Sequence, residues 1–552
     1  MTNGQQDADD GGPGPGPGPA ARAWRWLRSW RGMATAAAAI VLVAGIVYLL
    51  VIVLPTLDDC ASGVKGIDDQ CIGVSDSFAF HPSFAEVTGR IAAENVRVEE
   101  LSTRTDPASP TAVRDRVVTL LYVLPVPLAN ADLAELQRHE LEGAYVAQRN
   151  ANASPEYGGD RPLVRLVVAN IGDGGKYAGS IVERIRTYPA EERLVAVLGF
   201  GQSLEPIEEA INLLGRQAAD CLPDDPTCGA FPVITSLITA DGFAGLSTDQ
   251  RAPHVVRVVP TNADQARAAV AALAETRGTY RVVVVQDINP DDDYAETLGR
   301  QFTDAAGSAG ATVLRPEEYD STVEETIPQR MFGIARQLCD LRPDVVYFAG
   351  RAAHLRNLVD TARAPESGCQ DADDRIEVWT GDDAVNLPGS LPSNVTVTYT
   401  ALAHPGVWTA ENAALFTPRG LGCVDPAPEP AGTVCFAPEF SYPDGAYGEL
   451  ADGGAAIGHD VVLTAVLAVR TSGVPADRVG RSDVIAVGFP ALHGTNSVAG
   501  ASGWISICND GDPERKAVPI VELLPDSPAA VRPGPVPAAD GEPYTRGSPE
   551  QC

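Results

Sequence analysis

The chain has 552 residues, of which 45% are hydrophobic, and a formal net charge of −32 at pH 7. This length allows about two to four domains, and the hydrophobic content is that of a globular protein. The acidic balance argues against nucleic-acid binding, because a phosphate backbone needs a basic surface.

The first part of the chain predicts a membrane anchor. Residues 1–32 contain a Gly/Pro tract with no apolar side chains to bury, which predicts a disordered stub, followed by four arginines among three tryptophans. Residues 33–54 then run without a charge, and about 20 apolar residues span a bilayer. Positive charge before this run, and Asp58 and Asp59 after it, indicate a cytoplasmic N-terminus. We therefore expect a single-pass protein of the cell membrane whose main domain is extracellular.

All ten cysteines follow the predicted span, on the side of the membrane where disulfides persist. Their spacings do not match the C-x-x-C patterns of zinc or redox sites, so we expect disulfides that staple loops. Connectivity is not deducible from the spacing. The near pairs are Cys60 with Cys71, Cys221 with Cys228, Cys339 with Cys369 and Cys423 with Cys435, which leaves Cys508 and Cys552.

Residues 55–113 form a lead region with one expected helix. Ser83 and Glu86 have the spacing of a capping box. Apolar residues then recur at helical intervals up to Val98, which predicts a helix that packs on the main body.

From residue 116 onward, apolar strands alternate with amphipathic helices, which predicts βαβ units and parallel sheets. One such sheet would be unusually large, so the expected class is α/β with two doubly wound domains. The Pro-rich tail over 524–552 is expected to be extended and mobile. Strands are expected over 116–127, 163–172, 194–201, 231–237, 254–260, 280–287, 311–319, 343–350, 376–382 and 394–401, and helices over 128–151, 176–188, 205–217, 262–277, 294–309, 323–341 and 352–364.

The turn GFGQSLE, around Ser203, is the first candidate for chemistry. Unpaired backbone N–H groups at a helix start attract anions, so Ser203 is either part of an anion cradle or an ordinary N-cap. A nucleophilic serine is disfavoured, because the G-x-S-x-G pattern needs a glycine where this chain has Glu205.

Other motifs give weaker signals. His139 lacks the second histidine of H-E-x-x-H, so a zinc hydrolase is unsupported. NPDDDY, residues 289–294, is either a calcium site without the spacing of an EF-hand or a solvated helix start. The sequence contains no Walker loop and no strand-linked G-x-G-x-x-G, and no cofactor or metal is expected.

Several segments in order resemble the type I periplasmic binding proteins, especially the branched-chain amino-acid binding group used by ABC importers. They include VLGFGQS, FPVITSLITADGFAGL, PHVVRVVPTNADQARA, DVVYFAG and VWTGDDA. Residues 447–469 resemble the closing helix of that family, and 505–523 resemble its last β-hairpin. The resemblance covers about residues 114–523. It implies two Rossmann-like lobes joined by crossing strands, with lobe 1 over 114–257 and 399–500 and lobe 2 over 258–398 and 501–523.

The resemblance also implies a ligand site. Family members hold an amino-acid carboxylate with the serine of this turn and with the next loop, which favours the cradle for Ser203. A lobe 2 tyrosine matches Tyr294, and the acidic residue that receives the ligand's ammonium group matches Asp382, with Asp383 beside it. Arg351 replaces an aromatic residue, and it either favours an anionic ligand or points to solvent. The candidate ligand-binding residues are Gln202, Ser203, Thr235, Ser236, Ile238, Thr239, Tyr294, Arg351 and Asp382.

The implied function is extracytoplasmic binding of an amino acid or a related carboxylate, without enzymatic activity. An ABC permease or a membrane signalling protein would be the partner. The anchor departs from the family, whose members are normally free or lipid-tethered. Two alternatives remain: a ligand-free scaffold for protein interaction, and a hydrolase that uses Ser203 or a metal. Few lysines among many arginines, with abundant Ala, Gly and Pro, suggest an actinobacterial source.

Overall fold

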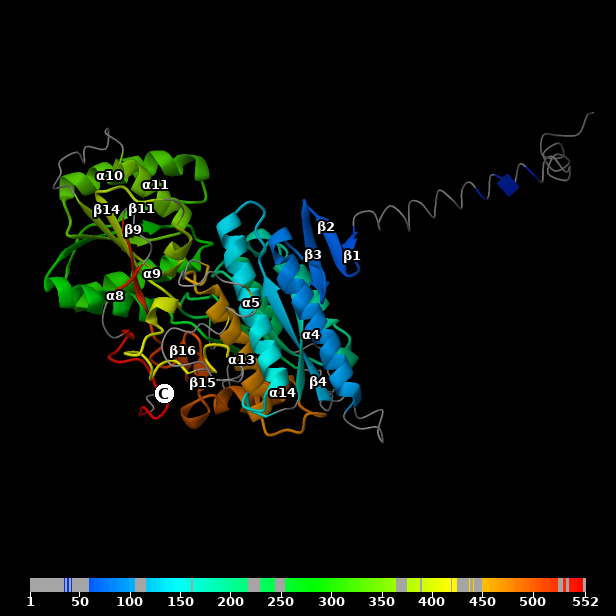
Figure 1. The fold of residues 1–552 in the computed structure, drawn as a ribbon. Helices are drawn as coiled ribbons and strands as arrows, with labels where there is room; N and C mark the ends of the chain where they lie inside the picture. The colour runs from blue at the N-terminus through cyan, green and yellow to red at the C-terminus, as the bar shows by residue number, and fades with distance from the viewer. Residues whose placement is uncertain are drawn as a thin grey trace, which may run out of the picture. The chain divides into compact units, whose positions relative to one another are not determined.

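The computed structural model (Figure 1) describes the parts of the chain that follow. They are residues 59–104, 116–159, 162–216, 229–243, 254–363, 375–387, 390–417, 419–423, 449–524, 530–532 and 536–549, with the single residues 34, 37, 38, 41, 436 and 440. The chain divides into two compact units, Met1–Asp68 and Asp69–Cys552. The described part of the first unit is an antiparallel pair of strands, β1 (Asp59–Ala61) and β2 (Val64–Ile67).

The predicted stub and membrane span lie outside the described residues, apart from the four single residues before β1. Among the described residues, the helix long and apolar enough to cross a membrane is α13 (Gly454–Thr471), and 83% of its apolar window is buried inside the protein. α13 is therefore a core helix, and the N-terminal anchor stays a prediction.

The second unit contains two large sheets, each the centre of one lobe, and a small two-stranded sheet. In lobe 1, the first strand is antiparallel to its neighbour and the others are parallel. Both faces of this sheet are covered, so its strands are continuous apolar runs. The order across the sheet is β3 (Gln70–Ser75), β5 (Leu163–Asn170), β4 (Val117–Leu124), β6 (Leu194–Gly199), β7 (Val233–Thr235) and β8 (Val255–Arg257).

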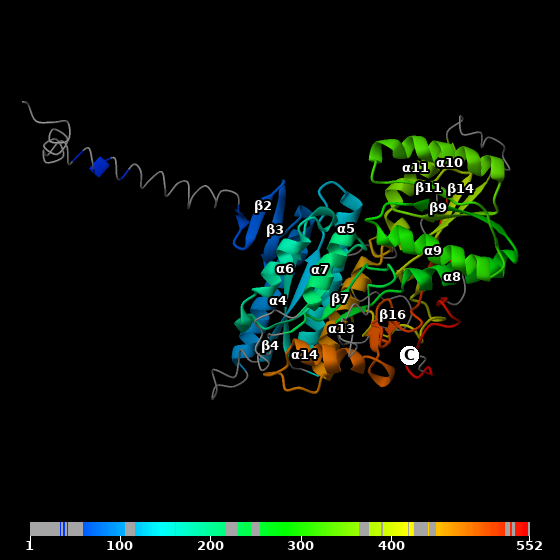
Figure 2. The ribbon, with the colours of Figure 1, turned by 180° about the vertical axis from the view of Figure 1, so that it is seen from behind.

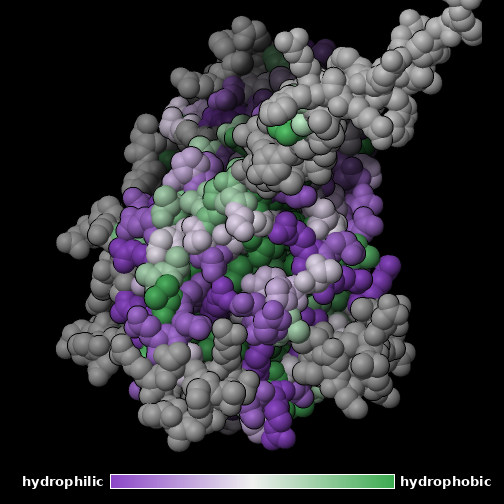
Figure 3. Space-filling model, turned by 90° about the vertical axis from the view of Figure 1, so that its right-hand side faces the viewer, coloured by the Kyte–Doolittle hydropathy of each residue, from purple (hydrophilic) through white to green (hydrophobic). Residues whose placement is uncertain are grey.

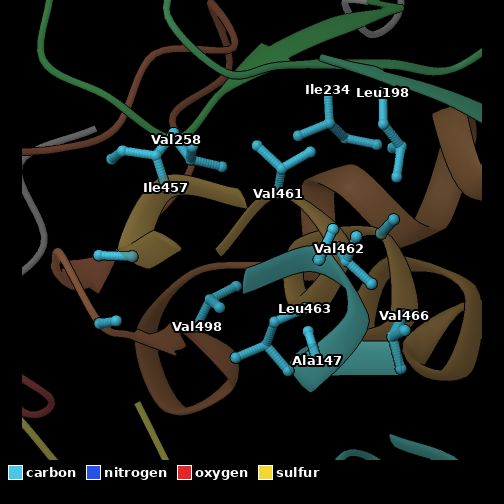
Figure 4. Close-up of a cluster of buried hydrophobic side chains, with 14 of the residues drawn as sticks. Ala147, Leu198, Ile234, Val258, Ile457, Val461, Val462, Leu463, Val466 and Val498 are labelled. Carbon is cyan, nitrogen blue, oxygen red and sulfur yellow. The ribbon is translucent and has the colours of Figure 1, made fainter. Parts of the chain in front are cut away.

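Helices α4 (Ala85–Arg104), α5 (Ala131–Ala153) and α13 cover one face of the lobe 1 sheet, and α6 (Ala178–Arg186) and α7 (Glu205–Gly215) cover the other (Figures 1 and 2). Figure 4 shows the core beneath α13, where Val461 lies toward Leu198 and Ile234 of the sheet.

Helices α5 and α13 meet at glycines. A Cβ at Gly143 would overlap the carbonyl of Ala455, and one at Gly458 would overlap the carbonyl of Glu140. The two backbones therefore touch where no larger residue fits.

The lobe 2 sheet is parallel from β10 to β14 and ends in antiparallel strands. Its order is β10 (Thr312–Val313), β9 (Arg281–Asp287), β12 (Val345–Ala349), β13 (Ile376–Thr380), β14 (Val395–Thr400), β17 (Ile520–Leu523) and β18 (Ala530–Val531), and β11 (Glu317–Tyr319) also pairs with β9.

Helices α8 (Asn262–Arg277) and α9 (Asp293–Ser308) cover one face of this sheet, and α10 (Ile327–Leu341) and α11 (Ala352–Arg363) cover the other (Figure 1). A capping box of Thr261 and Asp264 starts α8. The chain passes between the lobes after β8, after β14 and between β16 (Gly503–Ile505) and β17.

Short elements fill the connections. The remaining strand is β15 (Val498–Gly500), which pairs with β16. The short helices are η2 (Pro82–Phe84), η4 (Asp173–Gly175), η5 (Ala190–Glu192), η6 (Glu324–Thr326), η8 (Asp382–Asn386), η9 (Pro405–Val407), α14 (Arg481–Asp483), the π-helix η10 (Val484–Gly488), η11 (Phe489–Ala491) and η12 (Gly494–Asn496).

Four expectations about these elements are wrong in detail. The strand expected over 311–319 is two short strands, because Pro316 lacks the N–H that a continuous strand needs. The hairpin expected over 505–523 is reduced to a short turn with one antiparallel bridge, Ile507 with Pro513, since β16 pairs with β15 and β17 pairs with β14. Ser83 does not form the expected capping box, because the chain enters α4 through η2, whose N-cap is His81.

The fourth correction concerns the tail, which is packed rather than mobile in its described part. β18 extends the lobe 2 sheet, and the Tyr544 hydroxyl lies 3.1 Å from the hydroxyl of Ser497. Tyr544 is 1% exposed, so apolar burial holds the proline-rich segment in place.

The described cysteines are Cys60, Cys71, Cys339, Cys423 and Cys508, and all five are disulfide-bonded. Disulfides at these five cysteines are as expected, and the compartment stays a prediction. The other five cysteines lie outside the described residues.

On the face of the molecule drawn in Figure 3, hydrophilic residues border a smaller central group of hydrophobic ones.

Candidate ligand-binding cleft

A pocket lies between the two lobes of the second unit. Its enclosed volume is about 30 Å³, within a hollow of about 530 Å³ that includes open solvent. Seven of its fourteen lining residues are aliphatic, and polar or charged side chains come from both lobes. Its lining residues are Leu133, Leu136, Gln202, Leu237, Ala401, Leu402, Asp452 and Ile457 on one side, and Tyr294, Arg351, Asp382, Asp383, Val385 and Asn386 on the other.

Arg351 comes from the end of β12 and is held by lobe 2. Its Nε and Nη2 donate to the two carboxylate oxygens of Asp292, at 2.7 and 2.6 Å. Nη2 also donates to the carbonyl of Ser203 in lobe 1, at 3.2 Å. Burial disfavours the charged guanidinium, but the carboxylates of Asp292 and Asp383 outweigh it and raise the pKa of Arg351. Arg351 is therefore a charged link between the lobes.

Tyr294, at the start of α9, is packed against this arginine. The guanidinium carbon of Arg351 lies 4.6 Å from the centre of its ring, a cation–π contact. Its hydroxyl accepts the backbone N–H of Asp383, at 3.2 Å. Burial, and then the charges of Asp382 and Asp383, raise the pKa of Tyr294 well above its usual value, so the phenol stays neutral.

Asp382 follows β13 and faces the cleft. Its Oδ1 accepts from Nε2 of Gln265, at 2.7 Å, and from the hydroxyl of Thr239, at 3.5 Å. In the described part of the chain, its Oδ2 accepts no hydrogen bond. Burial raises the pKa of Asp382 to about 7, although the hydrogen bond from Gln265 acts in the opposite direction. One carboxylate oxygen on the pocket wall is therefore left for a ligand.

Lobe 1 contributes its own acid, Asp452, from the turn before α13. Its Oδ2 lies 2.5 Å from Nδ1 of His139, and its Oδ1 accepts the backbone N–H of Gly454. Burial lowers the pKa of His139, but the hydrogen bond and charge of Asp452 outweigh burial and raise it.

Acidic groups also meet at the start of α7, where lobe 1 touches lobe 2. The backbone N–H of Glu205 donates to the carbonyl of Asp291, at 3.2 Å. Burial, and then the neighbouring Glu208, raise the pKa of Asp293 to about 6. Glu205 and Glu208 of lobe 1 therefore lie close to Asp291 and Asp293 of lobe 2, beside the cleft.

Ser203 is not an N-cap in this structure, and its hydroxyl oxygen faces a neighbouring loop. Leu204 is the N-cap residue of α7, and it provides no side-chain cap. The Ser203 hydroxyl instead accepts the backbone N–H groups of Thr239 and Ala240, at 3.1 and 3.2 Å. This contact ties the turn after β6 to the loop after β7, and it occupies two N–H groups that a ligand carboxylate would need.

The structure therefore separates the predicted site residues into two groups. Gln202, Tyr294, Arg351 and Asp382 line the pocket. The others are at most 1% exposed and lie behind its wall: Ser203, Thr235, Ser236, Ile238 and Thr239.

Sequence reasoning missed three residues that shape the site, namely Asp292, Gln265 and Asp452. Asp292 lies in the NPDDDY motif, where it caps α9 and pairs with Arg351. The sequence could have predicted this pair, because Asp292 follows β9 and the oppositely charged Arg351 follows β12, the neighbouring strand. Gln265 and Asp452 carry no such signal, because their position depends on how the lobes meet. Within the described residues, no group of three or more His, Cys, Asp or Glu side chains is placed to hold a metal ion.

No protein-family description and no curated protein matches the sequence. Solved structures do match. One is an ABC transporter substrate-binding protein from Desulfitobacterium hafniense, with 18% identity over 75% of this chain and 100% of that one and a TM-score of 0.52. The chain has the type I periplasmic binding-protein fold.

Two further structures share this fold. A leucine-binding protein from Thermotoga maritima is 18% identical over 75% of this chain and 98% of that one, with a TM-score of 0.51. A solute-binding protein of an ABC transporter from R. palustris, in complex with 4-hydroxybenzoate, is 12% identical over 77% of this chain and 98% of that one, with a TM-score of 0.53. These structures are solute-binding proteins, which carry out no covalent chemistry. The resemblance seen in the sequence is thus confirmed for the fold.

Proposed function

We propose that this protein binds a small organic solute by closing its two lobes over it, on the outer side of the cell membrane. The observation that carries the proposal is the pocket between the lobes, into which polar side chains converge from both sides. The solved structures of the same fold include proteins described with leucine and with 4-hydroxybenzoate, which supports a solute of that size.

An amino acid is one ligand that fits the proposal, because its ammonium group would find the unpaired oxygen of Asp382. The apolar run over 33–54 and the disulfide-bonded cysteines support a location outside the cell. Uptake would need an ABC permease as partner, whereas sensing would need a membrane signalling protein.

The test is a thermal-shift series on the full-length chain in detergent, with amino acids, carboxylates and amines. A ligand at 100 times its dissociation constant adds about 2.7 kcal/mol, which raises the midpoint by about two degrees or more. Asn386→Trp would fill the pocket and should abolish the shift, whereas Asp304→Trp, on the exposed side of α9, should not.

A ligand-free scaffold is the second candidate, and one observation favours it. The lobes touch directly through Arg351 and the Ser203 carbonyl, and through Glu205 and Asp291, and the enclosed volume between them is only about 30 Å³. In that case no compound would shift the midpoint, and Asn386→Trp would leave the protein's interactions unchanged.

A further inference from the structure

A second cavity lies in lobe 2 and shares no lining residue with the pocket between the lobes. It is lined by strands β13, β14 and β17, by the end of α8 and by Arg532, the residue after β18. Its volume is about 420 Å³, within a hollow of about 810 Å³ that includes open solvent. Known ligand pockets hold about 300–1,000 Å³, so this cavity is large enough for a small molecule.

The strand register explains why one face of the sheet is polar here. Glu377 pairs with Thr396, and Trp379 pairs with Thr398, so these four side chains share one face of β13 and β14. Thr398 also pairs with Glu522 of β17, which brings a third strand to the same face. The residues between them point the other way, into an apolar core of lobe 2. Three neighbouring strands therefore carry polar groups where a sheet buried on both faces would be apolar.

Two Arg–Glu pairs line the cavity. Nη2 of Arg277 donates to Oε2 of Glu377, whose Oε1 accepts the indole N–H of Trp379 at 2.8 Å. Nε of Arg532 lies 3.1 Å from Oε1 of Glu522, and its guanidinium carbon lies 5.6 Å from the centre of the Trp379 ring. The two positive and two negative charges balance, so the wall as a whole attracts neither a cation nor an anion.

Several polar groups of the wall are left without a hydrogen bond to any described residue. They are the hydroxyls of Thr396 and Thr398, Nη1 and Nη2 of Arg532, and Oε2 of Glu522. Thr398 is only 5% exposed, and a buried hydroxyl is normally hydrogen-bonded. Its partner must therefore come from the cavity.

These unused groups match a ligand that both donates and accepts hydrogen bonds. Guanidinium nitrogens only donate, carboxylate oxygens only accept, and threonine hydroxyls do either. A hydroxyl group of a ligand can meet each of them without bringing a charge, whereas an anion would face Glu522 and a cation would face Arg532. Leu524, which is 39% exposed, adds an apolar surface for a carbon skeleton.

We propose that this cavity is a second ligand site, which takes an uncharged polyhydroxyl compound, that is, a sugar or a polyol. The hydroxyls of Thr396 and Thr398, the free nitrogens of Arg532 and Oε2 of Glu522 bind its hydroxyl groups. All of these residues belong to lobe 2 and its sheet, so binding does not require the lobes to close. The site is thus separate from the proposed function.

A saturation-transfer NMR titration of the full-length chain tests the proposal, in a detergent without a sugar head group. The neutral probes are glucose, myo-inositol and maltotriose, and the charged probes are succinate and putrescine. At least one neutral probe should bind, and neither charged probe should displace it. Binding of maltotriose alone would identify a segment of a longer saccharide as the ligand, whereas binding of glucose or myo-inositol would identify a free compound.

Variants test whether the probe lies in this cavity. Thr398→Trp would fill the cavity and should abolish binding. Arg532→Gln should weaken binding by about tenfold or more, because hydrogen bonds from a charged group are stronger than those from an amide. Arg300→Gln, in an exposed Arg–Glu pair of α9, is the matched control and should leave the affinity unchanged. Asn386→Trp, in the pocket between the lobes, should leave it unchanged as well.

The thermal midpoint without ligand shows which variants are folded, and Arg532→Gln decides if Thr398→Trp is not. The proposal is wrong if no neutral probe binds, or if Arg532→Gln stays within about twofold of the parent. Displacement of the neutral probe by succinate or putrescine would show that the site takes a charged ligand instead. Loss of binding in Asn386→Trp alone would place the probe between the lobes, which would support the proposed function and contradict this site.

Discussion

The two walls of the cleft are built in different ways. The lobe 1 wall is mostly apolar, and its polar loop residues are turned inward, where Ser203 holds Thr239 and Ala240. The lobe 2 wall carries Asp382, Asp383 and Arg351, which are held by hydrogen bonds within that lobe. Lobe 1 therefore contributes mostly apolar surface and one acid, Asp452, whereas lobe 2 contributes most of the charged groups of the wall.

The lobes also differ in what fixes their walls. Lobe 1 relies on a backbone-to-backbone contact between α5 and α13, which leaves no space for a side chain. Lobe 2 relies on an ion pair, Arg351 with Asp292, near the surface of the cleft. Packing changes should thus act most strongly in lobe 1 and charge changes in lobe 2.

The largest expected effect is that of Gly143→Ala in lobe 1. The added Cβ would overlap the Ala455 carbonyl, so the helices must separate, which should cost about 3 kcal/mol or more of unfolding free energy. Gly89→Ala is the control, because nothing lies within 4 Å of its Cβ position and alanine favours a helix by about 0.5–1 kcal/mol. Urea unfolding of both variants measures the difference. Equal stabilities would contradict the close contact.

Arg351→Ala should have the next largest effect, in lobe 2. It leaves Asp292 buried without its partner, which we expect to cost about 2–3 kcal/mol; a fully buried pair would cost more, and 17% of the Arg351 side chain is still exposed. Arg351→Lys keeps the charge but not the two parallel hydrogen bonds, so it should lose less. The urea midpoints rank the three proteins, and a lysine variant as unstable as the alanine variant would show that geometry matters more than charge.

A pH experiment tests the buried part of lobe 1. Burial raises the pKa of Glu140 to about 7, against the hydrogen bonds from Tyr122 and Ser236. The folded protein therefore holds this proton more tightly than the unfolded chain does. The resulting stability is complete below about pH 4 and is lost as the pH rises through 7.

From pH 5 to pH 8, the parent should lose about 2 kcal/mol more unfolding free energy than Glu140→Gln does. The exposed Glu99→Gln variant should follow the parent. Parallel curves for the parent and Glu140→Gln would mean that Glu140 is not protonated in the folded state.

The smallest effect belongs to an exposed pair of the same lobe 2. Arg300 and Glu296 are 3.3 Å apart, with side chains 50% and 58% exposed. Water screens this pair, so Arg300→Ala should change the unfolding free energy by less than about 0.5 kcal/mol. A loss similar to that of Arg351→Ala would show that the position of the pair within lobe 2 is unimportant.

Much of the fold was predictable from local pattern. α8 was expected over 262–277 and has those bounds, because its capping box and its alanine-rich sequence act locally. The strands of both sheets were visible as apolar runs, since sheets covered on both faces bury every side chain. Pairing between strands far apart in the sequence was not visible. The hairpin expected over 505–523 keeps a single bridge, Ile507 with Pro513, and β17 pairs with β14 instead.

The candidate site was predictable only in part. Tyr294, Arg351 and Asp382 follow strand ends, so the parallel sheet brings them to one edge. The direction of the Ser203 hydroxyl was not predictable, because a serine at a helix start can point out to a ligand or back to a neighbouring loop. The loop after β7 decides this by placing two N–H groups within reach.

The packed tail has a mechanical consequence. Val531, in β18, packs against the cores of both lobes, and farther along the chain Tyr544 is fastened to Ser497 and Gly494. The tail thus pairs with the chain that passes from β16 to β17, where the backbone N–H of Val518 also donates to the carbonyl of Pro537, at 2.9 Å. A hinge with such a brace has greater torsional stiffness, so the lobes should swing through a smaller angle than three bare strands would permit.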